Sequence, residues 1–234
     1  MTERKKITLV NPADYDALTR QIAATITSLE FADGPEIDVV TLTGGPPMMV
    51  SQENIDSVAE PLVKLIQADT DSAAFIIGCY ADPGLKEARA AAGGRKVFGM
   101  NQSGVATALA TGDRVGVIAV QQVAVERHRK YYEEQGVAAR IVGERAVEVD
   151  PELAKKGPTA FSPEMAAQAA IAAGTKLRDE DGADVILLGE GGMTALRDPV
   201  EQALGIPVVD PSLATIAMAI QAVEGFRPPA APAS

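Results

Sequence analysis

Two residues of this sequence, Cys79 and Glu190, have the side chains and the positions best suited to acid–base chemistry. Cys79 is the only cysteine in the 234 residues, and it follows an apolar run, residues 74–77, and one glycine. Glu190 follows a second apolar run, residues 185–188, and again one glycine. A thiol near a helix N-terminus is activated by the backbone N–H groups and the helix dipole. A carboxylate directly behind a buried strand loses part of its hydration, which suits a general acid or base.

Each of the two residues also has a purely structural interpretation. Free cysteine is among the most buried residue types, so Cys79 can be a structural thiol of the core. Glu190 can accept hydrogen bonds from the backbone of the turn that follows it, residues 191–193. The matching positions of the two residues favour the functional interpretation for both.

Short apolar runs alternate with longer alanine-rich amphipathic segments, a pattern typical of a parallel α/β sheet. Strands are predicted at residues 7–10, 37–42, 74–77, 96–98, 115–120, 139–143, 185–188 and 208–209. Helices are predicted at residues 15–29, 52–68, 83–92, 104–110, 123–135, 163–180, 199–203 and 212–223. Pro83 is expected in the first turn of its helix, with Asp82 as the N-cap.

The sequence also repeats its own pattern, since residues 71–79 parallel residues 182–190. We therefore predict an α/β protein of two similar, pseudo-symmetric lobes, each a mostly parallel sheet flanked by helices. The first lobe is expected at residues 1–105, with a C-terminal helix at 209–226 packing back on it, and the second at 106–208, followed by a flexible tail at 227–234. Ligands bind beyond the carboxyl ends of parallel strands, which predicts an active site in the interlobe cleft, where Cys79 and Glu190 face each other.

The composition excludes several classes of function. The formal charge of −11 at pH 7 argues against binding to nucleic acid or to an anionic membrane. No run reaches membrane-spanning length and the single cysteine allows no internal disulfide, so a cytoplasmic location is expected. There is no P-loop, dinucleotide fingerprint or zinc-ligand spacing, so neither a cofactor nor a metal is expected. His128, the only histidine, lies in a charged segment and is expected on the surface.

Further candidates for substrate binding follow the other predicted strands. Asn11 ends the first strand and Gln121 ends its counterpart in the second lobe, so their side-chain amides can hold a carbonyl or a carboxylate. Pro47 lies in a glycine–proline loop behind the second strand and is also predicted to contact the substrate. Residues 101–103, Asn-Gln-Ser, are expected to cap a helix before the second lobe.

Six motifs, taken together, resemble the aspartate/glutamate/hydantoin racemase superfamily, especially its hydantoin and allantoin racemase branch. They are LVNP at 9–12, GPP at 45–47, GCYADPGL at 78–85, RVGVIAV at 114–120, LLGEGGM at 187–193 and GIPVVDP at 205–211. The resemblance covers most of the chain and implies two α/β lobes, an active site between them and no cofactor. It also implies two catalytic cysteines: one thiolate removes the α-proton, and the other thiol delivers a proton to the opposite face. Cys79 matches the first cysteine, whereas Glu190 stands where the second would fall.

The resemblance further implies that backbone amides behind each catalytic residue bind the carboxylate or the ring carbonyls of the substrate. In this sequence these are the amides of Tyr80, Ala81, Gly191 and Gly192. In the family, hydroxyl residues usually follow the Asn at the end of the first strand. Here residues 13 and 14 are Ala and Asp, which indicates an unusual substrate.

The sequence thus predicts an enzyme, a cofactor-independent isomerase that racemises or epimerises the α-carbon of a hydantoin-like or amino-acid-like substrate, with Cys79 and Glu190 as the acid–base pair. The alternative is a hydrolase that opens a cyclic imide, hydantoin or thiohydantoin ring with Glu190 activating water, or a decarboxylase or cis–trans isomerase. A non-catalytic small-molecule binding protein ranks last, because a buried carboxylate is costly unless it is used. The expected partner is a small molecule that carries a carboxylate or ring carbonyls, and the alanine-rich helices fit a homo-oligomer.

Overall fold

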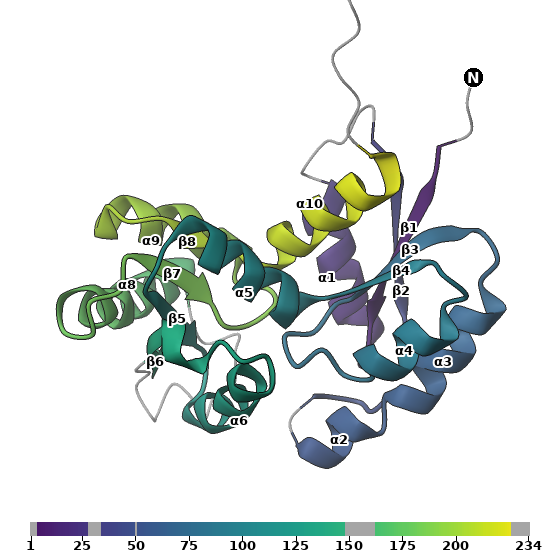
Figure 1. Ribbon diagram of the computed structural model, residues 1–234, viewed down its shortest axis with the longest axis horizontal. Coiled ribbons are helices and arrows are strands. Elements are labelled where there is room, and N and C mark those ends of the chain that lie inside the picture. The colour runs from purple at the N-terminus through teal and green to yellow at the C-terminus, as the bar shows by residue number, and fades with distance from the viewer. Residues whose placement is uncertain (1–3, 28–33, 50, 148–161, 226–234) are drawn as a thin grey trace, which may run out of the picture. The chain divides into compact units, whose positions relative to one another are not determined.

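A computed structural model describes residues 4–27, 34–49, 51–147 and 162–225 of the chain (Figure 1). The chain divides into two compact units, the first made of residues 1–100 and 215–234 and the second of residues 101–214. Each unit contains one four-stranded sheet. None of the helices within the described residues is long and apolar enough to cross a membrane. The predicted tail at 227–234 lies outside the described residues.

The first unit is built on a parallel sheet with the strand order β2-β1-β3-β4. Its strands are β1 (Lys6–Asn11), β2 (Glu36–Thr41), β3 (Ser72–Ile77) and β4 (Lys96–Gly99). Its helices are α1 (Asp16–Thr27), α2 (Gln52–Asp56), α3 (Ala59–Ala68), α4 (Leu85–Ala91) and α10 (Pro211–Glu224), the last of which belongs to this unit from Thr215 on.

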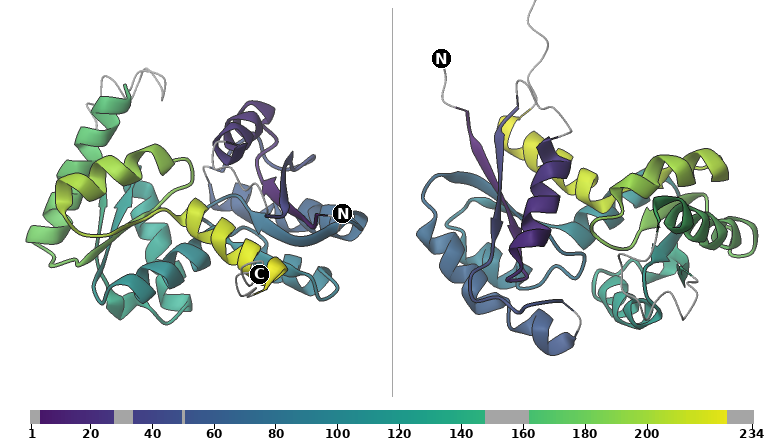
Figure 2. Two further views of the ribbon diagram at one scale, coloured as in Figure 1. Left: turned by 90° about the horizontal axis from the view of Figure 1, so that it is seen from above. Right: turned by 180° about the vertical axis from the view of Figure 1, so that it is seen from behind.

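The central strands β1 and β3 are apolar on both faces because helices cover both faces of this sheet. Val10, Phe75 and Ile77 join a core cluster with residues of α3 and α4. The intervening Leu9 and Ile76 join a second cluster, with residues of α1 and α10 (Figure 2). Alternate side chains of a strand point to opposite faces. The continuous apolar runs of the sequence are therefore what a sheet covered on both faces requires.

The second unit repeats this plan with the strand order β6-β5-β7-β8, again with all strands parallel. Its strands are β5 (Val115–Ala119), β6 (Ile141–Ala146), β7 (Val185–Leu188) and β8 (Val208–Val209). Its helices are α5 (Met100–Thr111), α6 (Gln122–Glu134), α8 (Pro163–Asp179) and α9 (Arg197–Leu204), with the short 3-10 helices η1 (Ala138–Arg140) and η3 (Thr194–Leu196). The predicted fold class, two similar parallel α/β sheets flanked by helices, is thereby confirmed.

Two helices of the first unit differ from the prediction. The helix predicted at residues 52–68 is divided into α2 and α3, because the α-helical hydrogen bonding stops at Ser57, the C-cap of α2. The helix predicted to start at Pro83 begins two residues later, behind Gly84 as its N-cap. The predictions that Asp82 caps this helix and that Pro83 lies in its first turn are wrong. Asp82 and Gly84 have φ values of 46° and 66°, so the backbone is left-handed at both and is not yet helical.

Helix α5 begins earlier than predicted. It starts at Met100, directly behind β4, so residues 101–103 lie inside the helix and the prediction that they cap it is wrong. The sequence predicts that this helix starts at Gly104. A Cβ there would lie 2.7 Å from the Cβ of Pro211, so this glycine serves close packing inside the helix instead.

Candidate active site

Cys79 and Glu190 occupy equivalent positions in the two sheets. Cys79 follows β3 after Gly78, and Glu190 follows β7 after Gly189. Each of the two glycine amides donates a hydrogen bond to a carbonyl oxygen of the neighbouring strand, at 2.8 Å in both cases. A Cβ at either position would lie 3.0 Å from that same oxygen and 2.9 Å from a side-chain carbon, so any larger residue would force its neighbours to shift. The chain is thus fixed in the same way immediately before each reactive side chain.

The loop behind β3 holds Cys79 half-buried. The Cys79 carbonyl accepts a hydrogen bond from the Asp82 amide at 3.0 Å, which closes a turn. The Asp82 carboxylate covers Gly99, where a Cβ would collide with it. Within the turn Tyr80 is buried and Ala81 is half-buried. Packing therefore fixes the loop on both sides of the thiol, and helix α4 begins only beyond this turn, so Cys79 does not lie in its first turn.

Asn11 is buried at the end of β1, and its side-chain amide is used by the neighbouring loop. Its Nδ2 donates to Thr19 Oγ1 at 3.0 Å and to the Tyr15 carbonyl at 3.3 Å, while its Oδ1 accepts from the Ala13 amide at 3.2 Å. The hydroxyls of Thr19 and Thr41 lie 2.7 Å apart beside it. Asn11 therefore shapes the loop at this end of the sheet, and its predicted contact with a substrate stays a prediction. The two threonine hydroxyls were not among the predicted site residues.

Four of the predicted substrate-binding residues are exposed to solvent: Pro47, Gln121, Gly191 and Gly192. Gln121 is the N-cap residue of α6, but its side chain makes no capping hydrogen bond. Gly192 has a φ of 83° and open space where a Cβ would be. These groups lie behind β2, β5 and β7, at the carboxyl ends where ligands of parallel sheets bind. Their contact with a substrate also stays a prediction.

Glu190 is half-buried, and its surroundings alter its acidity. Burial raises the pKa of Glu190, and the nearby negative charge of Glu144 raises this pKa further. The positive charges of His128 and Arg127 act in the opposite direction, without cancelling the effect of burial. A carboxyl group with a raised pKa carries its proton to higher pH, which suits a general acid as well as a base.

The prediction that His128 lies on the surface is wrong. Its side chain is 1% exposed, and its Nδ1 lies 2.6 Å from Oε1 of Glu144, whose side chain is 6% exposed. Burial raises the pKa of Glu144, although hydrogen bonds from His128 and Tyr132 oppose the rise. Ala124, His128 and Tyr132 form the buried face of α6. Their spacing of four residues is the signal in the sequence that indicates a buried histidine.

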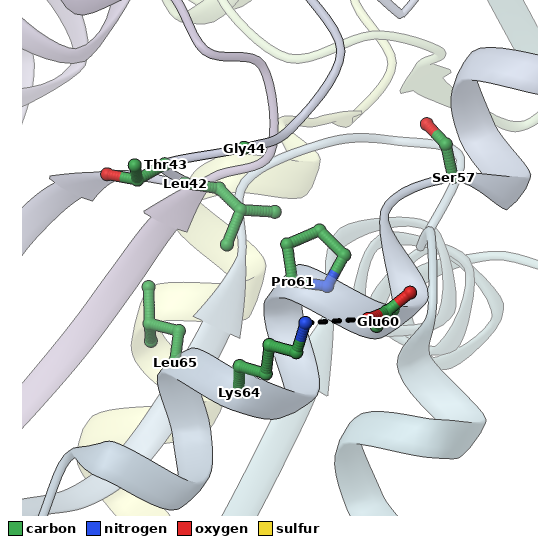
Figure 3. Close-up of a pocket in the computed structure, with 8 residues that line it drawn as sticks. All are labelled: Leu42, Thr43, Gly44, Ser57, Glu60, Pro61, Lys64 and Leu65. Carbon is green, nitrogen blue, oxygen red and sulfur yellow. Dashed lines mark hydrogen bonds and ion pairs between the residues drawn. The ribbon is translucent and has the colours of Figure 1, made fainter.

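The first unit also has a pocket of about 610 Å³, at the carboxyl end of β2 (Figure 3). It is lined by Leu42, Thr43, Gly44, Ser57, Glu60, Pro61, Lys64 and Leu65, none of which is a predicted site residue. Its two charged side chains neutralise each other, since Lys64 Nζ lies 2.6 Å from Glu60 Oε1. This pocket contains neither Cys79 nor Glu190, the two candidate proton carriers.

A metal centre finds no support among the described residues. They contain no group of three or more His, Cys, Asp and Glu side chains that could hold a metal ion.

Comparison with known proteins supports the description of the fold. A family model described as Asp/Glu/Hydantoin racemase matches residues 7–219. The hydantoin racemase of Rhizobium meliloti is 28% identical over 220 residues, which cover 91% of this chain and 86% of that protein. The hydantoin racemase of Pseudomonas sp. (strain NS671) is 29% identical over 218 residues, covering 92% and 84%. Among solved structures, the allantoin racemase from Klebsiella pneumoniae has a TM-score of 0.81 at 24% identity, covering 94% of this chain and 88% of that one.

Proposed function

The chain belongs to the Asp/Glu/hydantoin racemase family, and from this premise we propose that it is a cofactor-independent racemase or epimerase of a small molecule. The reaction takes place at the α-carbon of a hydantoin-like or amino-acid-like substrate, with Cys79 and Glu190 as the two proton carriers. The observation that carries the proposal is the equivalent placement of these two residues behind Gly78 and Gly189. Assembly into a homo-oligomer and a cytoplasmic location stay predictions from the sequence.

The proposed reaction needs one group to take a proton and another to give one. The Cys79 thiolate removes the α-proton from one face of the substrate, and the electron pair of the broken C–H bond moves onto the adjacent carbonyl. Protonated Glu190 then delivers its proton to the opposite face of the α-carbon. Cys79 ends as a thiol and Glu190 as a carboxylate, so the product enantiomer reacts through the same steps in reverse.

The raised pKa of Glu190 fits its role in this scheme. An ordinary glutamate is almost fully ionised near neutral pH and has little proton to give. Because burial raises the pKa of Glu190, a larger fraction of the carboxyl groups carries a proton at the pH where a thiol is partly ionised. The two groups can then exchange roles, as racemisation in both directions requires.

The negative charge that develops on the carbonyl oxygen needs hydrogen-bond donors. The backbone amides of Tyr80 and Ala81, and those of Gly191 and Gly192, are the proposed donors. Hydantoin rings are the easier substrates, because two ring carbonyls share in making the α-proton acidic and in spreading the charge.

Proton exchange in deuterated water tests this proposal for each enantiomer separately. We expect the wild-type protein to incorporate deuterium at the α-carbon of the substrate, which NMR detects. The optical rotation of the substrate solution should fall to zero. Glu190→Gln should stop racemisation, yet let Cys79 exchange the proton of the enantiomer that faces it. Cys79→Ser should instead exchange the α-proton of only the other enantiomer, the one that faces Glu190. The racemisation rate of each variant should fall by about a hundredfold to ten-thousandfold.

The exposed residue Glu126, on the same helix as His128, provides the matched control. Glu126→Gln should racemise at the wild-type rate. If Cys79→Ser and Glu190→Gln both keep wild-type racemisation, the proposed pair is not the catalytic one.

Ring opening is the second candidate function, and the carboxylate at position 190 favours it. A carboxylate can deprotonate water, which then attacks a ring carbonyl while Cys79 acts as nucleophile or acid. A product heavier by one water molecule, without α-deuterium in recovered substrate, would select this hydrolase over the racemase.

A further inference from the structure

The backbone of β1 loses one of its hydrogen bonds to β3 beside Cys79. The two strands are parallel, and the amide of Gly78 donates to the Val10 carbonyl at 2.8 Å. The next bond of a parallel ladder would run from the amide of residue 12 to the carbonyl of Gly78. Residue 12 is proline, which has no N–H to donate. The chain that follows β1 therefore needs other hydrogen bonds to hold its position next to the thiol.

The side chain of Asn11 supplies such bonds, and its neighbours fix the orientation of its amide. The Tyr15 carbonyl can only accept a hydrogen bond, so Nδ2 of Asn11 faces it at 3.3 Å. The Ala13 amide can only donate, so Oδ1 faces it at 3.2 Å. Nδ2 also donates to Thr19 Oγ1 at 3.0 Å. Because Asn11 is buried, these bonds form without competition from water.

Two threonine hydroxyls continue from this amide to a carboxylate in a single direction. Thr41 Oγ1 donates its one proton to Asp16 Oδ1 at 2.7 Å, because an ionised carboxylate only accepts. The bond of 2.7 Å between Thr19 Oγ1 and Thr41 Oγ1 must then use the proton of Thr19. Each hydroxyl thus accepts one hydrogen bond and donates one. Such a chain is cooperative, so the loss of one member weakens the others.

We propose that Thr19 and Thr41 are positioning residues, which hold the backbone behind β1 in the place where the substrate meets Cys79. They act through Asn11 and not by contact with the substrate. An edge of the sheet that is already ordered costs less free energy when the substrate binds. The loss of one hydroxyl should therefore weaken substrate binding more than it slows the chemical step. The effect on turnover rests on the proposed function, whereas the effect on the backbone beside the thiol does not.

Two substitutions of Thr41 separate positioning from stability. Thr41→Val removes the hydroxyl, whereas Thr41→Ser keeps it and removes the methyl group. Valine is the better strand residue, so Thr41→Ser should be the less stable of the two in urea unfolding. We expect the opposite order in activity on the hydantoin derived from alanine. Thr41→Val should raise KM by about twofold to tenfold, the range of one hydrogen bond, with little change in kcat, and Thr41→Ser should recover most of this loss.

Thr70→Val is the matched control, because it removes a threonine hydroxyl at the other end of the same sheet. Thr70 is exposed before the start of β3, and its Oγ1 donates to Oδ1 of Asp71 at 2.9 Å. This variant should keep the wild-type KM. An unchanged KM in Thr41→Val, or an equal rise of KM in Thr41→Val and Thr41→Ser, would overturn the assignment.

The reactivity of the thiol separates this proposal from the proposed reaction. Cys79 is the only cysteine, so alkylation by iodoacetamide reports on this position alone and needs no substrate. Local opening of the backbone beside the half-buried thiol should make Thr41→Val react about twofold to tenfold faster than the wild-type protein. Thr41→Ser and Thr70→Val should react at rates close to that of the wild type.

The two experiments together distinguish the possible failures. If alkylation of Cys79 is accelerated in Thr41→Val alone but no ring is racemised, the positioning role stands and the racemase proposal fails. If Thr41→Val is alkylated at the wild-type rate, the positioning role is refuted whatever the activity.

Discussion

Replacing Glu144 by alanine should destabilise the second unit much more than the removal of an exposed carboxylate. Glu144 lies on β6, and its Oε1 lies 2.6 Å from Nδ1 of His128 on α6. The Tyr132 side chain, also on α6, hydrogen-bonds the same carboxylate. Both partners are buried, so Glu144→Ala leaves two donors of α6 without their acceptor and without water.

The size of the effect follows from this burial. Each buried donor that loses its acceptor costs about 1–3 kcal/mol, and two such donors, on His128 and Tyr132, lose theirs in Glu144→Ala. We therefore expect the free energy of unfolding of the second unit to fall by about 3–5 kcal/mol. Since about 1 kcal/mol lowers the melting temperature of a chain of this size by roughly 2–4 °C, the midpoint should fall by about 6–20 °C.

The control is an ion pair of the same unit that is exposed. Glu180 Oε2 lies 2.8 Å from Nη2 of Arg145, but the Glu180 side chain is 60% exposed. Exposed pairs contribute about 0–1 kcal/mol, so Glu180→Ala should change stability by no more than that. The comparison separates the effect of burial from the effect of removing a negative charge.

Urea unfolding followed by circular dichroism measures the stabilities, and hydrogen exchange in α6 and β6 assigns the loss to the second unit. A double-mutant cycle with His128→Ala isolates the interaction, which should exceed about 1 kcal/mol. If Glu144→Ala lowers the free energy of unfolding no more than Glu180→Ala does, the Glu144–His128 pair does not stabilise the packing of α6 on β6. An interaction energy near zero in the double-mutant cycle would lead to the same conclusion.

Two further predictions concern the residues at the candidate site. Burial puts the folded-state pKa of Glu190 above its ordinary value of 4.5, so its protonated form contributes stability below that pH, and the contribution is lost as the pH rises through the folded pKa. Glu190→Gln has no such titration, so the free energy of unfolding of the variant should rise relative to that of the wild type as the pH increases from about 4.5 through the folded pKa. Urea unfolding at a series of pH values measures this difference. A difference that does not change with pH would contradict the assignment. Gly78→Ala and Gly189→Ala bring a Cβ to 3.0 Å from the carbonyl oxygens of Val10 and Ile118. Each should cost about 1–3 kcal/mol in urea unfolding and reduce turnover, whereas wild-type turnover in both variants would mean that the position of the reactive side chain tolerates this shift.

The sheets could be predicted from the sequence because their signal is local. Strands such as β7 are buried on both faces, so four consecutive apolar residues mark them without knowledge of their neighbours. The repeat of such a run, one glycine and one reactive residue predicted two similar units. The backbone also favours glycine at positions 78 and 189, since a Cβ at each would crowd a carbonyl oxygen of the neighbouring strand.

The turn behind Cys79 and the burial of His128 could not be predicted in the same way, because both depend on residues distant in the sequence. Asp82 is held with a φ of 46° in a turn whose carboxylate covers Gly99 on the neighbouring strand. A local reading of Asp-Pro instead favours the start of a helix. His128 lies among charged residues in the sequence, and only the pairing of α6 with β6 supplies Glu144 as its acceptor.

A carboxyl group cannot replace a thiol at an equivalent position without a change in its surroundings. A thiol holds its proton near neutral pH, whereas an exposed glutamate gives its proton up several pH units lower. For Glu190 to share protons with Cys79, its environment has to oppose ionisation, and burial and the charge of Glu144 do so. The pKa of Glu190 must not rise so far that the carboxylate never forms. The positive charges of His128 and Arg127 lower this pKa and so oppose the effect of burial. In the proposed reaction, the four ionisable side chains Arg127, His128, Glu144 and Glu190 of the second unit act as one arrangement, which adjusts the carboxyl group of Glu190 to the role of a thiol.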